Sequence, residues 1–157
     1  VYARLVDLTY YAPLTVLTYV AAVTITIGLG TSGLVLPYHN PIRLAKVAAT
    51  LDVLSGGRVM LGMGVGVIEE DLEAMGSPFA ERGAISDEMI AVMKELWTKD
   101  DPSFLGKYHS FSGMKFTPKP VQKPHIPISS AAPARLPYAG PPVRARSGIQ
   151  RPCLHTP

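Results

Sequence analysis

The chain has 157 residues, 47% of them hydrophobic and 17% charged, a balance typical of a globular protein and not of a disordered one. Four of its 15 Lys and Arg residues lie after position 128, where no Asp or Glu occurs. Residues 1–128 therefore carry 11 basic and 12 acidic side chains. This near-balance gives no electrostatic case for nucleic-acid binding. The only cysteine, Cys153, excludes an internal disulfide framework and a multi-cysteine zinc site and fits a cytoplasmic setting.

The chain begins without an initiator Met or a signal-peptide pattern, which predicts a fragment of a longer protein. No Asp, Glu, Lys or Arg lies between Asp7 and Arg43, so residues 14–36 are long enough to span a bilayer of ~30 Å. Pro13 and the apolar residues after it favour instead a helix, which gives way at Thr24 to β-branched residues of a strand. We expect no membrane contact. A small membrane-associated protein is the alternative.

A helix between two strands is predicted in the first half of the chain. The near-continuous apolar run 25–36 is typical of a strand covered on both faces. Asn40 is a suitable N-cap before Pro41 at the first helical position, and a glycine pair ends the helix. Residues 58–64 are predicted to form the second buried strand. The buried face of the helix is predicted to consist of Leu44, Val47, Ala48, Leu51 and Leu54.

The strand–helix alternation continues after the second strand. Acidic residues predict the start of a short helix over 69–75, and apolar residues at helical spacing predict a longer helix that ends near Trp97. Aromatic and glycine residues between 104 and 116 suggest a hairpin, and a proline-rich connector then leads to a third strand at 125–128. This alternation indicates a parallel sheet, which binds ligands at the turns that follow its strands.

Two glycine-containing motifs are candidates for a ligand site. Residues 62–66 have the spacing G-x-G-x-G between a strand and a helix, where backbone N–H groups can approach phosphate oxygens. The spacing is not the dinucleotide fingerprint G-x-G-x-x-G, and such glycines could also serve only tight strand packing. Residues 31–33 set two hydroxyls beside a glycine inside the first strand. They indicate either a bulge facing a planar ligand or relief of crowding in a barrel strand.

The sequence assigns no catalytic residue and no metal ligand. His39 follows the first strand, where parallel barrels carry catalytic groups, but no neighbouring Cys or carboxylate completes a base or ligand set. His109 and His125 lie too far apart in the sequence to indicate a metal pair. No nucleophile–base pair is apparent.

Taken together, these segments have the sequence pattern of a known protein family. Residues 28–83, the L-W-T at 96–98 and residues 108–128 closely resemble the bacterial luciferase-like monooxygenase family, and within it the deazaflavin-dependent branch. The resemblance covers about residues 13–128. It implies an α/β fold, a (β/α)8 TIM barrel of which about three of the eight strands are present here.

The resemblance also implies an activity and its cofactor. Family members are oxidoreductases or monooxygenases that act on paired donors, with hydride transfer at the cofactor ring. The cofactor would be a deazaflavin coenzyme of the F-420 type or FMN, the substrate a small molecule, and the full-length relative a homo-oligomer. In this family the bulge matching Ser32 and Gly33 often contains a non-proline cis peptide that backs the cofactor ring. The loop at the cofactor phosphate matches Gly64, Val65 and Gly66.

The family's first two strands and its last strands are missing from this sequence, which predicts open sheet edges and exposed apolar faces. We therefore expect the polypeptide alone to be aggregation-prone and inactive. A non-catalytic remnant that binds no ligand is the alternative to an oxidoreductase fragment.

Two regions are predicted: residues 1–128 form the partial barrel domain, and residues 129–157 form an irregular tail rich in Pro and Arg. Codons for residues 129–148 can be chosen so that a frame displaced by a single nucleotide reads LIGGASPAALRRAARSGA. That alternative completes a strand, adds a glycine turn and opens an amphipathic helix, and it resembles the next strand and helix of the family. We hypothesise that the tail is the product of a frameshift. A disordered basic tail, or a proline-rich ligand for an adaptor module, is the alternative.

The frameshift hypothesis can be tested on the gene. Nucleotide sequencing across the codons for residues 125–157 should reveal a frame displacement near position 129, with the luciferase-like pattern continuing in the second frame. An uninterrupted frame that encodes the present tail would contradict the hypothesis.

Overall fold

The computed structural model of the chain describes residues 10–130. The larger elements are, in chain order, α1 (Pro13–Val23), β1 (Leu29–Val35), α2 (Pro41–Ser55), β2 (Val59–Gly64), α3 (Glu69–Ala74), α4 (Arg82–Thr98) and β5 (Ile128–Ser130). The loops contain the short 3-10 helices η2 (Leu36–Tyr38) and η3 (Phe79–Glu81) and an antiparallel hairpin of β3 (Phe104–Leu105) and β4 (Ser110–Phe111). This order confirms the predicted alternation and the predicted hairpin.

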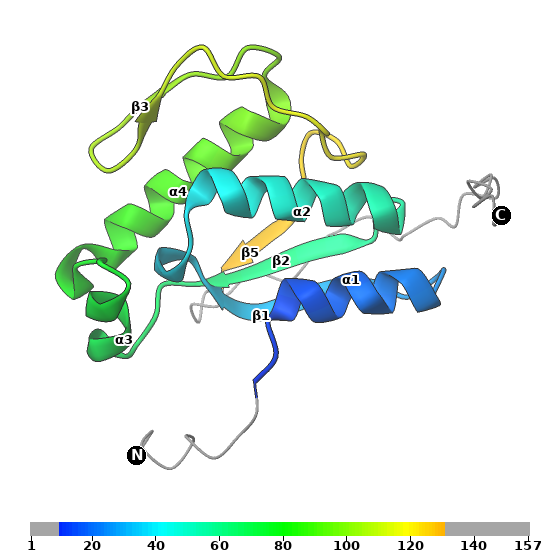
Figure 1. The fold of residues 1–157 in the computed structure, drawn as a ribbon, viewed down its shortest axis with the longest axis horizontal. Coiled ribbons are helices and arrows are strands. Elements are labelled where there is room, and N and C mark those ends of the chain that lie inside the picture. The colour runs from blue at the N-terminus through cyan, green and yellow to red at the C-terminus, as the bar shows by residue number, and fades with distance from the viewer. Residues whose placement is uncertain (1–9, 131–157) are drawn as a thin grey trace, which may run out of the picture.

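The sheet has the order β1-β2-β5, and both of its strand pairs are parallel. Helix α2 connects β1 to β2, and α4 lies in the connection from β2 to β5. Because α2 contacts both α1 and α4, the three long helices form one layer beside the sheet (Figure 1). Consecutive parallel strands with a helix in each crossover are the building unit of an α/β barrel wall.

Strand β1 differs from its prediction in two ways. It begins at Leu29 rather than position 25, and the Ile25 side chain in the preceding loop is 87% exposed. It is also buried on one face only, because Leu29 and Leu34 are buried whereas Gly30 and Ser32 are exposed. A near-continuous apolar run predicts two covered faces. The uncovered face of β1 carries glycine and serine, so its exposure leaves no large apolar side chain in water.

Residues 14–36 do not form the single continuous helix that the membrane-spanning alternative required. They contain most of the 11-residue helix α1, a loop and strand β1. Among residues 10–130 no helix combines the length and the apolar character needed to cross a bilayer.

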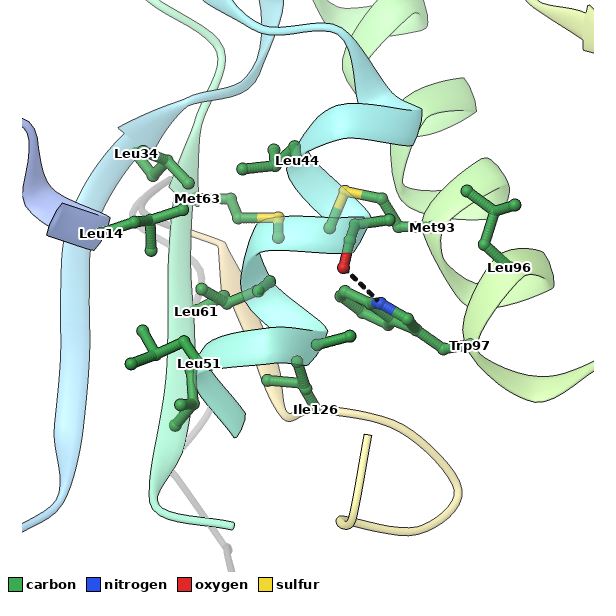
Figure 2. Close-up of a cluster of buried hydrophobic side chains, with 14 of the residues drawn as sticks. Leu14, Leu34, Leu44, Leu51, Leu61, Met63, Met93, Leu96, Trp97 and Ile126 are labelled. Carbon is green, nitrogen blue, oxygen red and sulfur yellow. Dashed lines mark hydrogen bonds between the residues drawn. The ribbon is translucent and has the colours of Figure 1, made fainter. Parts of the chain in front are cut away.

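The core lies between the sheet and the helical layer (Figure 2). Leu61 and Met63 of β2 pack against α2, and Trp97 of α4 is 1% exposed and donates its indole N–H to the carbonyl oxygen of Ala45 at 3.0 Å. This bond satisfies the one polar atom of the buried indole. The predicted apolar face of α4 is confirmed, with all five of its residues buried: Ile85, Met89, Val92, Met93 and Leu96.

Helix α2 begins as predicted, because the Asn40 side chain accepts hydrogen bonds from two backbone N–H groups of the first turn. Its buried face is only partly as predicted. Leu44, Ala48 and Leu51 are buried, but Val47 and Leu54 are 39% and 64% exposed. Two small residues and two polar ones are buried in their place: Ala45, Ala49, Asp52 and Ser55. The small side chains let α4 approach α2 closely enough for the Trp97 bond.

Arg58 fixes the end of α1 to the start of β2. Its side chain is buried, and its guanidinium donates to the carbonyl oxygens of Ala21, Thr24 and Ile27 and to the hydroxyl of Thr24. These oxygens include the unpaired carbonyls at the carboxyl end of α1, where a positive charge is favourable. Arg58 therefore sets where the chain leaves α1 and enters β1.

Asp52 fixes the segment that leads into β5. Its carboxylate is fully buried and accepts hydrogen bonds from the backbone N–H of Val121 at 2.9 Å and of Gln122 at 3.2 Å. The Gln122 amide nitrogen donates to the same carboxylate at 2.7 Å and to the carbonyl oxygen of Val59 at 2.8 Å. A polar bridge thus connects α2, the proline-rich connector and the first residue of β2.

Strand β5 extends beyond the predicted boundary at position 128. Ser129 and Ser130 pair with Gly62 and Met63 of β2, so the first two residues of the predicted tail belong to the sheet. The pairing of parallel strands uses only backbone N–H and C=O groups, so the ladder can extend to these residues whatever their side chains. The rest of the predicted tail, residues 131–157, lies outside the described part of the chain.

Replacing Asp52 with Ala should lower the free energy of unfolding by roughly 2–3 kcal/mol, because buried N–H groups lose a charged acceptor. Urea denaturation followed by the fluorescence of Trp97, the single tryptophan, measures the change. Asp87→Ala is the matched control, since Asp87 is exposed on α4. Equal stability of the two variants would show that the bridge contributes nothing.

Candidate functional site

Strand β1 contains a β-bulge at Ser32 and Gly33. Thr31 pairs with Leu61 and Leu34 pairs with Met63, so two residues of β1 lie opposite the single residue Gly62 of β2. Gly33 has φ of 93°, a conformation that L side chains rarely adopt. The bulge predicted at this position is therefore confirmed, and Gly33 is the residue that makes it possible.

The bulge brings backbone of β1 directly against Gly62. A Cβ atom on Gly62 would lie 2.2 Å from the carbonyl oxygen of Thr31, a distance that no side chain can occupy. The hydroxyl of Thr31 donates to the carbonyl oxygen of Gly62 at 2.9 Å and fixes the two strands at this point. Position 62 thus requires glycine for packing, which is the structural role considered for the glycine motif.

The remaining glycines of the motif have different surroundings. A Cβ atom on Gly64 would lie 3.8 Å from the Cα atom of Gly33, an ordinary contact, so the backbone of β2 remains accessible there. Gly66 is buried with φ of 84°, and a Cβ atom on it would lie 3.0 Å from Val35 and 3.3 Å from Leu72. Gly66 therefore packs closely against Val35 of β1 and Leu72 of α3.

The five predicted cofactor residues are brought together at the carboxyl ends of β1 and β2. Gly64 lies beside Gly33, Ser32 is exposed, and the Val65 side chain is 42% exposed at the start of the following loop. Parallel sheets bind ligands at this end of their strands. The grouping is compatible with a shared site. The cofactor role of each residue stays a prediction.

One detail of the expected bulge is wrong. Within residues 10–130 the cis peptide bonds are those that precede Pro118 and Pro124, so the bond between Ser32 and Gly33 is trans. The positive φ of Gly33 already turns the chain into the bulge, and a trans peptide suffices.

A second group of polar side chains was not connected by the sequence analysis. His39 and His109 line one pocket of about 260 Å³, together with Ser77 and Tyr108. The hairpin brings His109 into this pocket by folding back onto α4, where Glu88 holds it. Sequence spacing could not reveal the pair, because 69 positions separate the two histidines and only the path of the hairpin brings them to one pocket.

Comparison with known proteins identifies the family. The profile of the luciferase-like monooxygenases matches residues 3–140. The chain belongs to the luciferase-like monooxygenase family. Membership confirms the resemblance recognised in the glycine-containing strands, and it agrees with the parallel sheet and helical layer described above.

Two curated relatives in this family use different cofactors, as their names state. A coenzyme F-420-dependent glucose-6-phosphate dehydrogenase of Amycolatopsis mediterranei is 35% identical over 125 residues, which cover 77% of this chain and 38% of the relative. An FMNH2-dependent dimethylsulfone monooxygenase of Pseudomonas putida is 34% identical over 99 residues, which cover 61% of this chain and 27% of the relative. The chain thus spans well under half the length of either relative.

A solved structure supports the same fold. The monooxygenase RslO1 of Streptomyces bottropensis superposes with a TM-score of 0.73 and 28% sequence identity, over 78% of this chain and 40% of that one. The described sheet and its helices therefore correspond to part of a luciferase-like α/β barrel, which confirms the predicted fold class.

Substituting Gly62 with Ala should destabilise the chain by roughly 3 kcal/mol, because the added methyl group forces β1 and β2 apart. Gly28→Ala is the control, since nothing lies within 4 Å of a Cβ atom at that position. Urea denaturation monitored by Trp97 fluorescence compares the two variants. A Gly62→Ala chain as stable as the Gly28→Ala chain would contradict the close approach of the strands.

Proposed function

We propose that this chain is the cofactor-holding part of a flavin- or deazaflavin-dependent oxidoreductase of the luciferase-like family, acting on a small-molecule substrate. The observation that carries the proposal is the bulge at Ser32 and Gly33 lying beside Gly64 at the carboxyl ends of two parallel strands. Backbone without large side chains is what a flat ring system needs in order to lie close to a sheet.

The residues present fit such a group. Ser32 is exposed, and a Cβ atom on Gly64 would meet only Gly33, so a planar ring could contact the backbone at the bulge. Ser32 and Gly33 would hold the ring, and Gly64 and Val65 would lie on the phosphate side. Gly66 would maintain the loop from below, through its packing against Leu72. The cofactor, when bound, supplies hydride transfer at its ring, and these residues orient it.

The choice between FMN and coenzyme F-420 stays open in this proposal, because relatives of similar identity use either one. The whole protein would be a cytoplasmic homo-oligomer. We further propose that the 157-residue chain is inactive and aggregation-prone by itself. The exposed Ile25 and Ile27 side chains support this, and so do the outer edges of β1 and β5, which pair with no further strand among residues 10–130. Unpaired strand edges associate with other chains.

A restored barrel tests the cofactor site. Residues 10–128 would replace the corresponding segment of a full-length relative, and FMN and coenzyme F-420 would each be titrated by fluorescence. We expect binding of at least one of them. Gly64→Leu should weaken it by about tenfold or more, equivalent to ~1.4 kcal/mol, because the new side chain projects over the bulge.

Gly83→Ala is the control, because a Cβ atom at this α4 position has open space around it. A folded barrel that binds neither cofactor would favour the non-catalytic remnant. Unchanged binding by Gly64→Leu would mean that the cofactor lies elsewhere. A monodisperse 157-residue chain with micromolar flavin affinity would contradict the proposed inactivity.

A further inference from the structure

Helix α1 has no charged side chain on any of its faces. Its sequence is PLTVLTYVAAV, and neither its first nor its last turn contains an acidic or basic residue. A surface helix of a globular protein normally carries charged or polar residues toward solvent, whereas a helix that is apolar all round is normally buried. Helix α4 follows the usual pattern, because its exposed residues include Asp87 and Lys94. Helix α1 thus has the composition of a buried helix.

One side of α1 is nevertheless exposed. Leu14 and Ala21 are buried where the helix packs against β1 and α2. At 3.6 residues per turn, the opposite side of the helix is formed by Val16, Tyr19 and Val23. These three side chains are 41%, 71% and 63% exposed. The helices of an α/β barrel form an outer ring, so the helices that complete the barrel would lie beside α1 and leave this outer side uncovered.

The exposed apolar side of α1 continues onto α2, which contacts α1 on one flank and α4 on the other. Ala45 marks the α4 flank, because its carbonyl oxygen accepts the indole N–H of Trp97. Val47 and Leu54 project from the opposite flank of the helix and are 39% and 64% exposed. Thr50 lies between them and donates its hydroxyl to a carbonyl oxygen of its own helix at 2.8 Å. Covering this flank would therefore leave no hydroxyl without a partner.

The exposed apolar area of the two helices is large enough for a specific protein contact. We call it the α1–α2 face, and it consists of Val16, Tyr19, Val23, Val47 and Leu54. At their exposed fractions these side chains present roughly 500 Å² of surface, so two copies that meet there would bury ~1,000 Å², the lower limit for a specific interface. Apolar patches of this size on soluble proteins mark interaction sites.

We propose that the α1–α2 face is the surface through which two copies of this chain associate about a two-fold axis. A symmetric pair places the same patch on both partners. Because the five side chains are uncharged, the patch can meet itself without bringing like charges together. The exposed Arg43 stands at the amino-terminal end of α2, where it would lie on the rim. This association specifies the homo-oligomer proposed above and rests on that proposal, but it does not involve the cofactor site.

A membrane surface is the other partner that an apolar helix could have. Helices that lie in the membrane interface carry Lys or Arg on their polar face, and α1 contains neither. A helix that crosses a bilayer needs about 20 residues, and α1 has 11. The composition and the length of α1 therefore favour a second protein copy over a lipid surface.

Light scattering measures the mass of the 157-residue chain, fused to a monomeric soluble carrier, over a range of concentrations. We expect a dimer that dissociates on dilution. Tyr19→Glu should raise its dissociation constant by about 100-fold or more, because two carboxylates would meet in an apolar contact. Leu105→Glu is the matched control and should leave the dimer unchanged, since Leu105 is 91% exposed on the hairpin. Circular dichroism shows whether both variants keep their fold. A chain that stays monomeric at high micromolar concentration, or a dimer that Tyr19→Glu does not weaken, would overturn the proposal.

Thiol labelling separates this contact from association through the sheet edges. Cys153→Ser removes the only cysteine, and Val23→Cys or Leu105→Cys then introduces one inside or outside the face. We expect the cysteine at position 23 to react more slowly as the chain concentration rises, and the one at position 105 to react at a constant rate. Equal protection of both positions, or of neither, would contradict the two-fold contact.

Flotation with vesicles of phosphatidylcholine and phosphatidylserine tests the lipid alternative. We expect the chain not to float with the vesicles. Flotation that Tyr19→Glu abolishes would assign the face to a membrane surface and would overturn the proposal. None of these measurements contains FMN or coenzyme F-420, so their outcome is independent of whether the bulge holds a cofactor.

Discussion

The close approach of β1 to β2 at Gly62 is the constraint on which the rest of the structure depends. Two residues of β1 fit opposite this one position only because Gly62 has no side chain to meet the carbonyl oxygen of Thr31. The bulge resets the register, so that Val35 pairs with Gly64 and the two strands end at the same level. The candidate cofactor residues meet there as a direct consequence.

The helical layer keeps this arrangement in place through two buried charged residues. Arg58 connects the carbonyl oxygens at the end of α1 to the start of β2, and Asp52 connects α2 to the segment that leads into β5. In both cases the charge is compensated by backbone dipoles, supplemented by single side chains, rather than by an opposite charge. Hydrogen bonds of fixed direction thus position the strands. The apolar core, which includes Leu61 and Trp97, fills the space between the sheet and the helices.

Local signals in the sequence were sufficient for the element order and the family. Asn40 caps α2 as its short-range backbone preference predicted, whereas the bulge at Ser32 and Gly33 was implied by the family resemblance and not by the residues alone. What could not be predicted depends on tertiary contacts. The burial of Asp52 requires the connector some 70 positions later, and the placement of His39 and His109 in one pocket requires the fold-back of the hairpin.

The one-sided burial of β1 differs from the two covered faces that its apolar sequence run predicts. Its covered face carries leucines, whereas its open face carries Gly30 and Ser32. A barrel interior lined by such residues cannot be filled by the side chains of this wall alone, in contrast to barrels whose interior is packed with branched residues. Glycine on this face leaves the proposed cofactor site uncovered, at the expense of the stability that a branched side chain would add.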